Sequence, residues 1–259
     1  MSSDATKPNI SRIYDYMLGG FNNFEPDRRA AEEVLKVFPA YPRWAKLNRW
    51  FLQLVAEQWA AQGEKRIMDL GSGLPTQGHL HTILPDAKIL YTDNDAIAVA
   101  YARELLQDTP NVRYEQVDMR DASMVITMAE QTFGSDRQVA IGCIGISYFI
   151  DDTHLQELMH ALHDWAAPGS IMALTAPYSD ILLDDTRETV AWFKRNNAEI
   201  FSRNEEMLRT LCAPWKMATF KPLSEWLDVK HLMHEADYVD NTEFNGVVFE
   251  HAETKAKEV

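Results

Sequence analysis

The sequence predicts an α/β fold built on a mostly parallel sheet, and three observations predict this class. Short apolar runs alternate with helical segments through the middle of the chain, a glycine-containing loop follows the first run, and an Asn-Gly pair separates two strand-like runs near the end. Alternating strands and helices are typical of a parallel sheet covered by helices on both faces. The Asn-Gly pair predicts a two-residue hairpin turn, so the last two strands should be antiparallel.

Residues 1–63 are expected to form a helical N-terminal extension ahead of the sheet. Its apolar residues recur at helical spacing. Three helices are expected: one capped by Ser11 that stops at Gly19-Gly20, one from Pro26 to Phe38, and one from Arg43 to Gln62.

Residues 64–259 are expected to form the α/β core. Its expected strands are the apolar runs at 66–71, 88–93, 112–118, 139–146 and 170–176, and its clearest helices cover 95–106 and 152–166. A mostly helical insertion is expected over about 178–232. The chain should then end in a hairpin that turns at Asn245-Gly246.

The composition disfavours a nucleic-acid or protein substrate without excluding either. The net charge is −14 and no basic patch is visible, so a nucleic-acid partner is not expected. No apolar run approaches the roughly 20 residues of a membrane span, and the first residues contain no apolar signal segment, so a cytoplasmic location is expected. Cys143 and Cys212 lack metal-ligand spacing, so no metal site is expected. The oligomeric state stays open.

The loop "MDLGSGLPTQG" after the first strand has the features of a ligand site. Gly71 and Gly73 allow the backbone to approach a ligand closely, and ligands of open α/β sheets bind beyond the carboxyl ends of the strands. The first three strands carry an aspartate at or near that end: Asp69, Asp93 and Asp118. A dinucleotide fingerprint would have a third glycine where this chain has Thr76, which disfavours a nicotinamide cofactor.

An acidic edge favours a ligand with a cationic end and a free ribose, and S-adenosylmethionine (SAM) has both. The arrangement resembles class I SAM-dependent methyltransferases, which implies a Rossmann-like seven-stranded sheet with a reversed last strand. The resemblance implies that the loop and Asp69 face the methionine portion, that Asp93 holds the ribose, and that Asp118 and Met119 recognise the adenine. Ile144–Ser147 would line the sulfonium side, and S-adenosylhomocysteine would be the product.

Four stretches narrow the resemblance to a bacterial S-adenosylmethionine methyltransferase family that was formerly catalogued as a domain of unknown function. They are "YDYMLGGFNNFEPDR" (14–28), "NRWF" (48–51), "LPTQGHLH" (74–81) and "YTDND" (91–95). The similarity covers about residues 8–175. It adds to the implied cofactor site the residues Tyr14, Asp15, Gly19, Asn23, Arg49, Ser72, Thr76 and Asn94.

The stretch "IYDYMLGGFNNF" (13–24) is interpreted as a lid over the cofactor. Aromatic rings would cover the adenosine, Asp15 and the asparagines would bind its polar groups, and Gly19-Gly20 would form the turn. The alternative is a helix that only packs on the sheet, although buried polar groups would then need partners.

The expected activity is transfer of a methyl group from SAM to an O or N atom of a small molecule. Tyr148, Tyr178 and His81 are candidates for a catalytic role, although methyl transfer can proceed by positioning alone. The aromatic residues of the insertion, such as Trp192 and Phe193, would cap the acceptor pocket. A SAM-binding protein without transferase activity and a nicotinamide-dependent oxidoreductase are the two alternatives.

Overall fold

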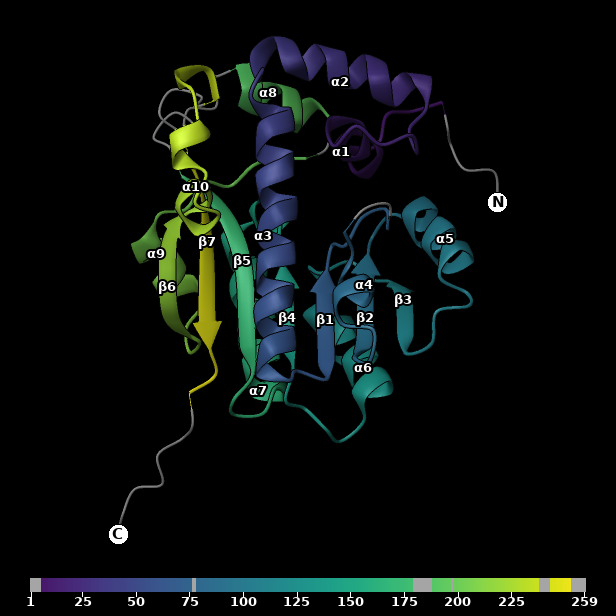
Figure 1. The fold of residues 1–259 in the computed structure, drawn as a ribbon, viewed down its shortest axis with the longest axis vertical. Coiled ribbons are helices and arrows are strands. Elements are labelled where there is room, and N and C mark those ends of the chain that lie inside the picture. Colours follow the sequence, from purple (N-terminus) through teal and green to yellow (C-terminus); the bar gives the residue numbers. More distant parts are fainter. Residues whose placement is uncertain (1–5, 76–77, 179–187, 197, 238–242, 253–259) are drawn as a thin grey trace.

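The computed structural model describes residues 6–75, 78–178, 188–196, 198–237 and 243–252 (Figure 1). The N-terminal helices are α1 (Ile10–Met17), α2 (Glu25–Val37) and α3 (Tyr41–Gln62). The elements that follow are β1 (Arg66–Leu70), α4 (Leu80–Ile83), β2 (Lys88–Asp93), α5 (Ala96–Leu105), β3 (Val112–Gln116), α6 (Ala122–Phe133), β4 (Ala140–Cys143), η1 (Ser147–Phe149), α7 (Asp152–Trp165) and β5 (Ile171–Tyr178). The last part contains α8 (Glu188–Arg195), α9 (Glu205–Leu211), β6 (Lys216–Pro222), α10 (Leu223–Trp226), η3 (Lys230–Leu232), η4 (Glu235–Asp237) and β7 (Glu243–Glu250).

The described strands form one seven-stranded sheet in the order β3-β2-β1-β4-β5-β7-β6. The pairs from β3 to β5 are parallel, whereas β7 runs antiparallel to both β5 and β6. The predicted α/β class, with a seven-stranded sheet and a reversed last strand, is therefore confirmed.

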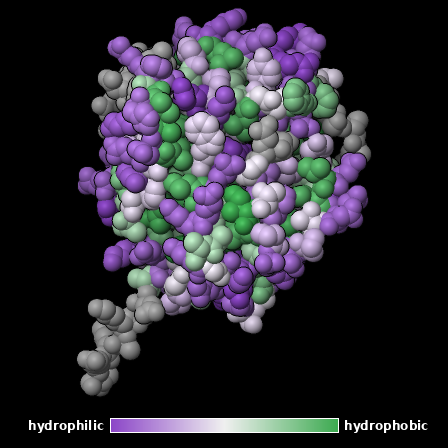
Figure 2. Space-filling view, viewed as in Figure 1, coloured by the Kyte–Doolittle hydropathy of each residue, from purple (hydrophilic) through white to green (hydrophobic). Residues whose placement is uncertain are grey.

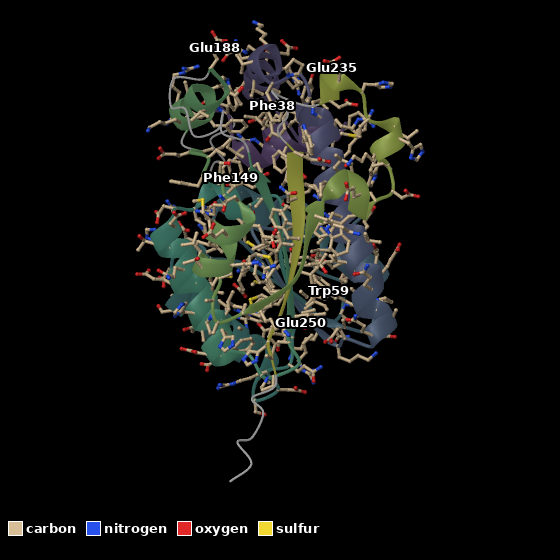
Figure 3. All side chains as sticks on the ribbon, turned by 90° about the vertical axis from the view of Figure 1, so that its left-hand side faces the viewer. Phe38, Trp59, Phe149, Glu188, Glu235 and Glu250 are labelled. Carbon is tan, nitrogen blue, oxygen red and sulfur yellow. The ribbon has the colours of Figure 1, made fainter. Side chains whose placement is uncertain are left out.

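The alternation of side chains along the strands divides the core into two apolar layers. Ile67 and Ile89 belong to a layer that also contains residues of α3, α4 and α5, while Met68 and Leu90 belong to a layer with residues of α6 and α7. Neighbouring residues of a strand point to opposite faces, so continuous apolar runs such as "RIMDL" can fill both layers. Figure 3 shows side chains on both sides of the sheet, with Trp59 of α3 labelled among them.

The N-terminal helices cover one face and one end of the sheet. Figure 1 shows α3 running along the sheet, with α1 and α2 near its upper end, above the carboxyl ends of β1 and β2. Asn9 caps α1 by accepting a hydrogen bond from the backbone N–H of Arg12, so the expectation that Ser11 is the cap was wrong. Gly63 ends α3 in the left-handed conformation, with φ 79°.

The predicted hairpin at Asn245-Gly246 is not formed, because β7 runs straight through both residues. The glycine is explained by packing. A Cβ atom built on Gly246 would lie 2.7 Å from the ring of Phe51 and 2.8 Å from the ring of Trp226. The indole N–H of Trp226 also donates to the Gly246 carbonyl at 2.9 Å.

In its described residues, the segment 178–232 contains the edge strand β6 as well as α8, α9 and α10, so the expectation of a mostly helical insertion missed a strand. The stretch "KMATFKP" pairs antiparallel with β7 and is followed directly by α10. Trp192 and Phe193 of α8 are buried against the helical layer, where the ring of Phe193 meets that of Tyr41 at 5.7 Å. Both therefore belong to the core that supports the cavity described below.

The surface carries apolar side chains in small groups that hydrophilic residues separate on the face shown in Figure 2. Within the described residues, no helix combines the length and the apolar character that a membrane span requires.

Candidate functional site

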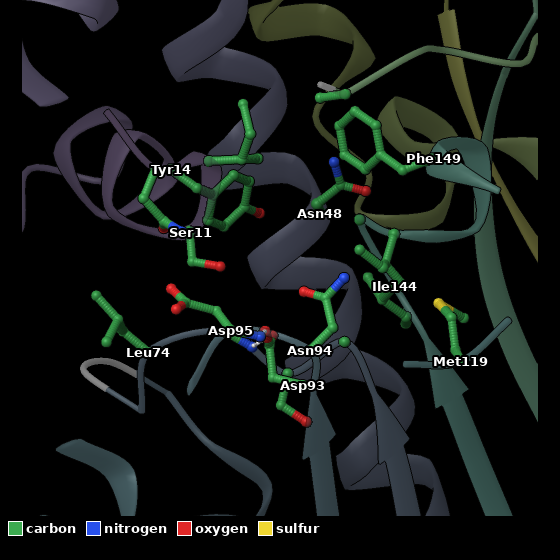
Figure 4. Close-up of a pocket in the computed structure, with 18 of the residues that line it drawn as sticks. Ser11, Tyr14, Asn48, Leu74, Asp93, Asn94, Asp95, Met119, Ile144 and Phe149 are labelled. Carbon is green, nitrogen blue, oxygen red and sulfur yellow. Dashed lines mark hydrogen bonds between the residues drawn. The ribbon is translucent and has the colours of Figure 1, made fainter. Parts of the chain in front are cut away.

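A cavity of about 400 Å³ lies between the carboxyl ends of the strands and the N-terminal helices (Figure 4). Its floor comes from the loops after β1, β2 and β3, one wall from the loop after β4, and its roof from α1 and α3. Of the predicted cofactor residues, the following line it: Tyr14, Asp15, Arg49, Asp69, Gly71, Ser72, Gly73, Asp93, Asn94, Asp118, Met119 and Ile144.

The glycine loop after β1 is shaped by two residues with positive φ. Gly71 (φ 63°) and Gly73 (φ 66°) adopt a conformation that L side chains rarely take, and a Cβ on Gly71 would also clash with Ile146. The Ser72 hydroxyl donates to the Asp69 carbonyl at 2.8 Å, which fixes the turn between the glycines. The loop can therefore present backbone, without side chains, to a ligand.

Asp93 connects the loops after β1 and β2. Its carboxylate accepts hydrogen bonds from the backbone N–H of Gly73 at 2.8 Å and of Asp95 at 2.9 Å. Burial raises its pKa, although these bonds oppose the shift. A partly desolvated carboxylate that faces the cavity still has acceptor capacity for the hydroxyl groups of a ligand.

Asp69 at the end of β1 is almost fully buried, and burial raises its pKa to about 7. The hydrogen bond from Ser72 and the charge of Arg49 lower this pKa, while the charge of Asp93 raises it further. A cationic ligand would stabilise the ionised form of a carboxyl group with such a pKa, so this position favours the binding of a cationic group.

Arg49 of α3 brings a positive charge to the cavity, and its Nε atom is buried without a hydrogen-bond partner among the described residues. A buried unpaired guanidinium nitrogen is costly, so it suits an anionic ligand group such as a carboxylate.

Asp118 and Met119 line the cavity after β3. The Asp118 carboxylate is bound by Arg120, at 2.5 Å from Nη2, and this hydrogen bond lowers its pKa. The predicted third aspartate is thus ionised beside a cation, while Met119 adds an apolar surface.

The turn between α1 and α2, which is part of the stretch interpreted as a lid, is held together by Asp15. Its Oδ2 atom accepts from the backbone N–H of Asn22 at 2.8 Å and from the side chain of Asn23 at 3.0 Å. A Cβ on Gly20 would clash with this carboxylate, which explains the second glycine. Gly19 and Asn23, two of the predicted cofactor residues, are not among the residues that line the cavity.

Two predicted candidates are not among the residues that line the cavity. Ser147 is fully buried, and its hydroxyl donates to the Thr175 carbonyl at 2.6 Å. The backbone N–H and Nδ1 of His81 lie 3.0 and 3.1 Å from the Tyr91 hydroxyl. Thr76 and the side chain of Tyr178 lie outside the described part of the chain.

Tyr148 lines the cavity as predicted, and burial raises its pKa well above the ordinary value. A tyrosine with a raised pKa stays protonated at neutral pH, so it can bind or orient a ligand but cannot remove a proton.

Sequence reasoning missed several residues at the upper end of the cavity, foremost Asn48 of α3. Asn48 is the first residue of the "NRWF" stretch, in which Arg49 was the residue predicted to bind the cofactor. The sequence indicated Asn48 only through the presence of an amide inside an amphipathic helix. Ser11 of α1 and Asn196 after α8 also line the cavity, and Figure 4 shows Ser11 facing Asp95 across it.

The residues present fit SAM. An acidic group with a raised pKa suits the ammonium, the unpaired Arg49 Nε suits the carboxylate, and Asp93 suits the ribose hydroxyls. Among the described residues, no group of three His, Cys, Asp or Glu side chains could hold a metal ion.

Comparison with known proteins supports the same assignment. A candidate methyltransferase from Thermobifida fusca YX is 25% identical with a TM-score of 0.84, and the match covers 96% of this chain and 97% of that chain. A DUF574 family protein from Streptomyces avermitilis MA-4680 is 22% identical with a TM-score of 0.82, covering 95% and 98%. The N-methyltransferase NodS from Bradyrhizobium japonicum WM9, in complex with S-adenosyl-L-homocysteine, is 12% identical with a TM-score of 0.52, covering 93% and 100%.

The second and third of these similarities show the fold alone. No curated protein matches the chain. A family model described as S-adenosyl methyltransferase matches residues 1–247. The match spans nearly the whole chain and agrees with the cavity at the strand ends, so this protein belongs to the S-adenosyl methyltransferase family and is a SAM-dependent methyltransferase.

Proposed function

We propose that the protein transfers the methyl group of SAM to an N or O atom of a small molecule inside this cavity. The observation that carries the proposal is that the cavity has two chemically different ends. Asp69, Asp93, Asp95 and Asp118 bring carboxylates to the strand ends. Neutral aromatic side chains, including Tyr41, Tyr148 and Phe149, line the rest of the cavity together with Asp15 and Arg49 from the helices. One end suits the cofactor and the other suits an acceptor.

We assign the cofactor to the charged end. Asp69 and the backbone of Gly71 and Gly73 would hold the ammonium side of the methionine portion, and Arg49 its carboxylate. Asp93 and Asn94 would bind the ribose, and Asp118 and Met119 the adenine. Ile144 would face the sulfonium.

SAM supplies an electrophilic methyl group when it is bound. The residues of the chain then act by positioning, which can contribute about 7–11 kcal/mol in well-oriented reactions. The buried surroundings exclude water that would compete with the acceptor.

We further propose that residues 1–63 act as the lid domain of the site. α1 contributes Tyr14, Asp15 and Ser11 to the roof, and α3 contributes Asn48 and Arg49. The Tyr101 hydroxyl on α5 donates to Asn22 Oδ1 at 2.7 Å, a contact that joins the lid turn to the core. A roof of this kind favours a small acceptor over a folded macromolecule, and the cavity volume is within the range of small-molecule sites.

The proposal can be tested with methyl-labelled SAM and a small-molecule extract. Incubation with the purified protein should give a labelled low-molecular-weight product together with S-adenosylhomocysteine. The control is the same extract with Asp93→Ala protein, which should give little product. Label that appears only in protein or nucleic acid would contradict the small-molecule acceptor.

The pKa of Asp69 predicts a pH dependence of SAM binding. Without ligand, burial keeps much of this carboxyl protonated below about pH 7. The ammonium of SAM favours the ionised form, so binding lowers the pKa and releases a proton. SAM affinity should therefore rise with pH up to about 7 and level off above it.

Calorimetry in two buffers of different ionisation enthalpy measures this proton release directly. Asp69→Asn should bind SAM more weakly and remove most of the release at pH 6.5. Proton release that persists unchanged in this variant would exclude Asp69 as its source.

A further inference from the structure

Three neutral polar groups meet at the end of the cavity beneath α1. A Cβ atom built on Gly145 would lie 3.8 Å from the hydroxyl oxygen of Tyr14, 4.0 Å from Cγ of Asn48 and 4.0 Å from the hydroxyl oxygen of Tyr148. These side chains come from α1, α3 and η1, which are far apart in the sequence. We call Tyr14, Asn48 and Tyr148 the amide–tyrosine cluster.

Asn48 is the incompletely satisfied member of this cluster. The residue is 2% exposed, and its Oδ1 atom has no hydrogen-bond partner among the described residues. The Tyr14 hydroxyl donates instead to the Ala45 carbonyl, at 2.9 Å. A buried amide oxygen without a donor is unfavourable, so the site is suited to a ligand that brings an N–H or O–H group.

The cluster contains no group that can remove a proton at neutral pH. Burial raises the pKa values of both tyrosines, so their hydroxyls stay protonated. Asp15, the nearest carboxylate on α1, directs Oδ2 at the lid turn. A hydroxyl acceptor would need a base for efficient attack, whereas an uncharged amine already carries a free electron pair.

The side chains that complete the cavity around the cluster are mostly uncharged. They include Tyr41, Phe149 and Ala198. Arg49 is close enough for its charge to oppose the rise that burial causes in the pKa of Tyr14, and we assign its guanidinium to the carboxylate of the cofactor. The ring of Phe149 lies 4.7 Å from that of Tyr148 and 6.0 Å from that of Phe193, so aromatic faces bound the space. Such walls suit a planar, uncharged molecule.

We propose that the acceptor is an uncharged amine on a planar small molecule, oriented by Asn48; this rests on the proposed function. The amine donates its N–H to Asn48 Oδ1, which leaves its electron pair free to face the methyl group. The nitrogen forms the new N–C bond while the C–S bond breaks, and the electron pair of that bond passes to sulfur. The product is an N-methylammonium ion, which loses its proton to water, so no residue of the chain needs to act as a base.

The site of methylation tests the amine assignment. The labelled product from the extract is isolated, and mass spectrometry identifies the atom that carries the methyl group. The proposal expects nitrogen. A methyl ether, ester or C-methyl product would overturn the amine assignment and leave the proposed transferase function standing. Formation of no labelled product by a protein that binds SAM would overturn the proposed function, and this inference with it.

Variants of Asn48 test its role with that acceptor. Asn48→Leu should raise the KM for the amine about tenfold or more, because the N–H then lacks a partner, while the Kd for SAM stays within about twofold. Gln58→Leu removes an exposed amide from the same helix and should change neither value. An unchanged KM in Asn48→Leu would overturn the role of Asn48.

The variant Asn48→Asp tests this role through the pH profile of the reaction, which would not change if Asn48 were purely structural. In the unmodified protein, kcat should rise with pH through the pKa of the bound amine, because kcat reports ionisations within the enzyme–substrate complex. A carboxylate at position 48 stabilises the protonated, unreactive ammonium, so this rise should shift to higher pH. A pH profile unchanged by Asn48→Asp would count against the proposal even if Asn48→Leu does not fold.

Discussion

Replacing Asp27 by alanine should lower the free energy of unfolding by about 3–5 kcal/mol. Asp27 is 0% exposed, and its Oδ2 atom lies 2.7 Å from Nε of Arg12, which is 2% exposed. Its carboxylate also accepts from the backbone N–H groups of Asn9 and Phe24, at 2.9 and 2.8 Å. The substitution leaves a buried guanidinium without its counter-charge and two N–H groups without an acceptor. Chemical denaturation measures the loss.

A second ion pair involving α2 provides the matched control. Arg29 and Glu25 lie 3.5 Å apart and are both mostly exposed, so Arg29→Ala should change the unfolding free energy by no more than about 0.5 kcal/mol. Arg12→Met combined with Asp27→Leu should recover part of the loss, because it removes both buried charges. Equal effects of Asp27→Ala and Arg29→Ala would refute the importance of burial.

Asp93→Ala should weaken SAM binding by about 1–3 kcal/mol, which is about 5- to 150-fold. In the proposed placement, the variant leaves the ribose hydroxyls without a charged acceptor. It also releases the Gly73 N–H, which Asp93 holds at 2.8 Å, so the glycine loop loses an anchor. Calorimetric titration with SAM and S-adenosylhomocysteine should show the same loss, because both contain the ribose.

The control for this variant is Asp108→Ala, which removes an exposed carboxylate after α5 and should leave the affinity unchanged. Asp93→Asn should have an intermediate effect, since it retains one oxygen acceptor. An unaltered dissociation constant in Asp93→Ala would place the ribose elsewhere.

The parallel part of the sheet was predictable because its strands are buried on both faces. In runs such as "RIMDL" and "KILYTD", apolar residues stand next to one another without alternation, and only a sheet covered by helices on both faces buries such runs. The strand-end aspartates were predictable for a related reason. Parallel strands place their carboxyl ends at one edge, so Asp69, Asp93 and Asp118 meet there whatever the helices do.

The antiparallel end of the sheet could not be predicted in the same way. Asn245-Gly246 has the local chemistry of a turn, but this glycine is required by Phe51 and Trp226, which approach from α3 and α10. Local sequence contains no information about that approach. Similarly, β6 has a mixed pattern of burial because it is an edge strand, so its apolar period is weak.

The stretch proposed as a lid, residues 13–24, shows how far local chemistry can mislead within a site. The asparagines of "GGFNNF" suggested ligand contacts, yet Asn23 satisfies Asp15 and the Gly20 carbonyl. Asn48, by contrast, lies in α3, whose apolar spacing predicts only a helix that packs against the core. Only the convergence of α1, α3 and η1 shows that its amide faces the cavity.

The position of β7 between β5 and β6 also sets the order in which the sheet can be completed during synthesis. β6 precedes β7 in the chain, but its strand partner in the described structure is β7, which lies between β5 and β6. A nascent chain therefore holds β6 without a neighbouring strand, and β5 with an open edge, until residues 243–250 emerge from the ribosome. Open edges can pair with other chains, so the interval before β7 arrives is when this protein is most exposed to misassembly.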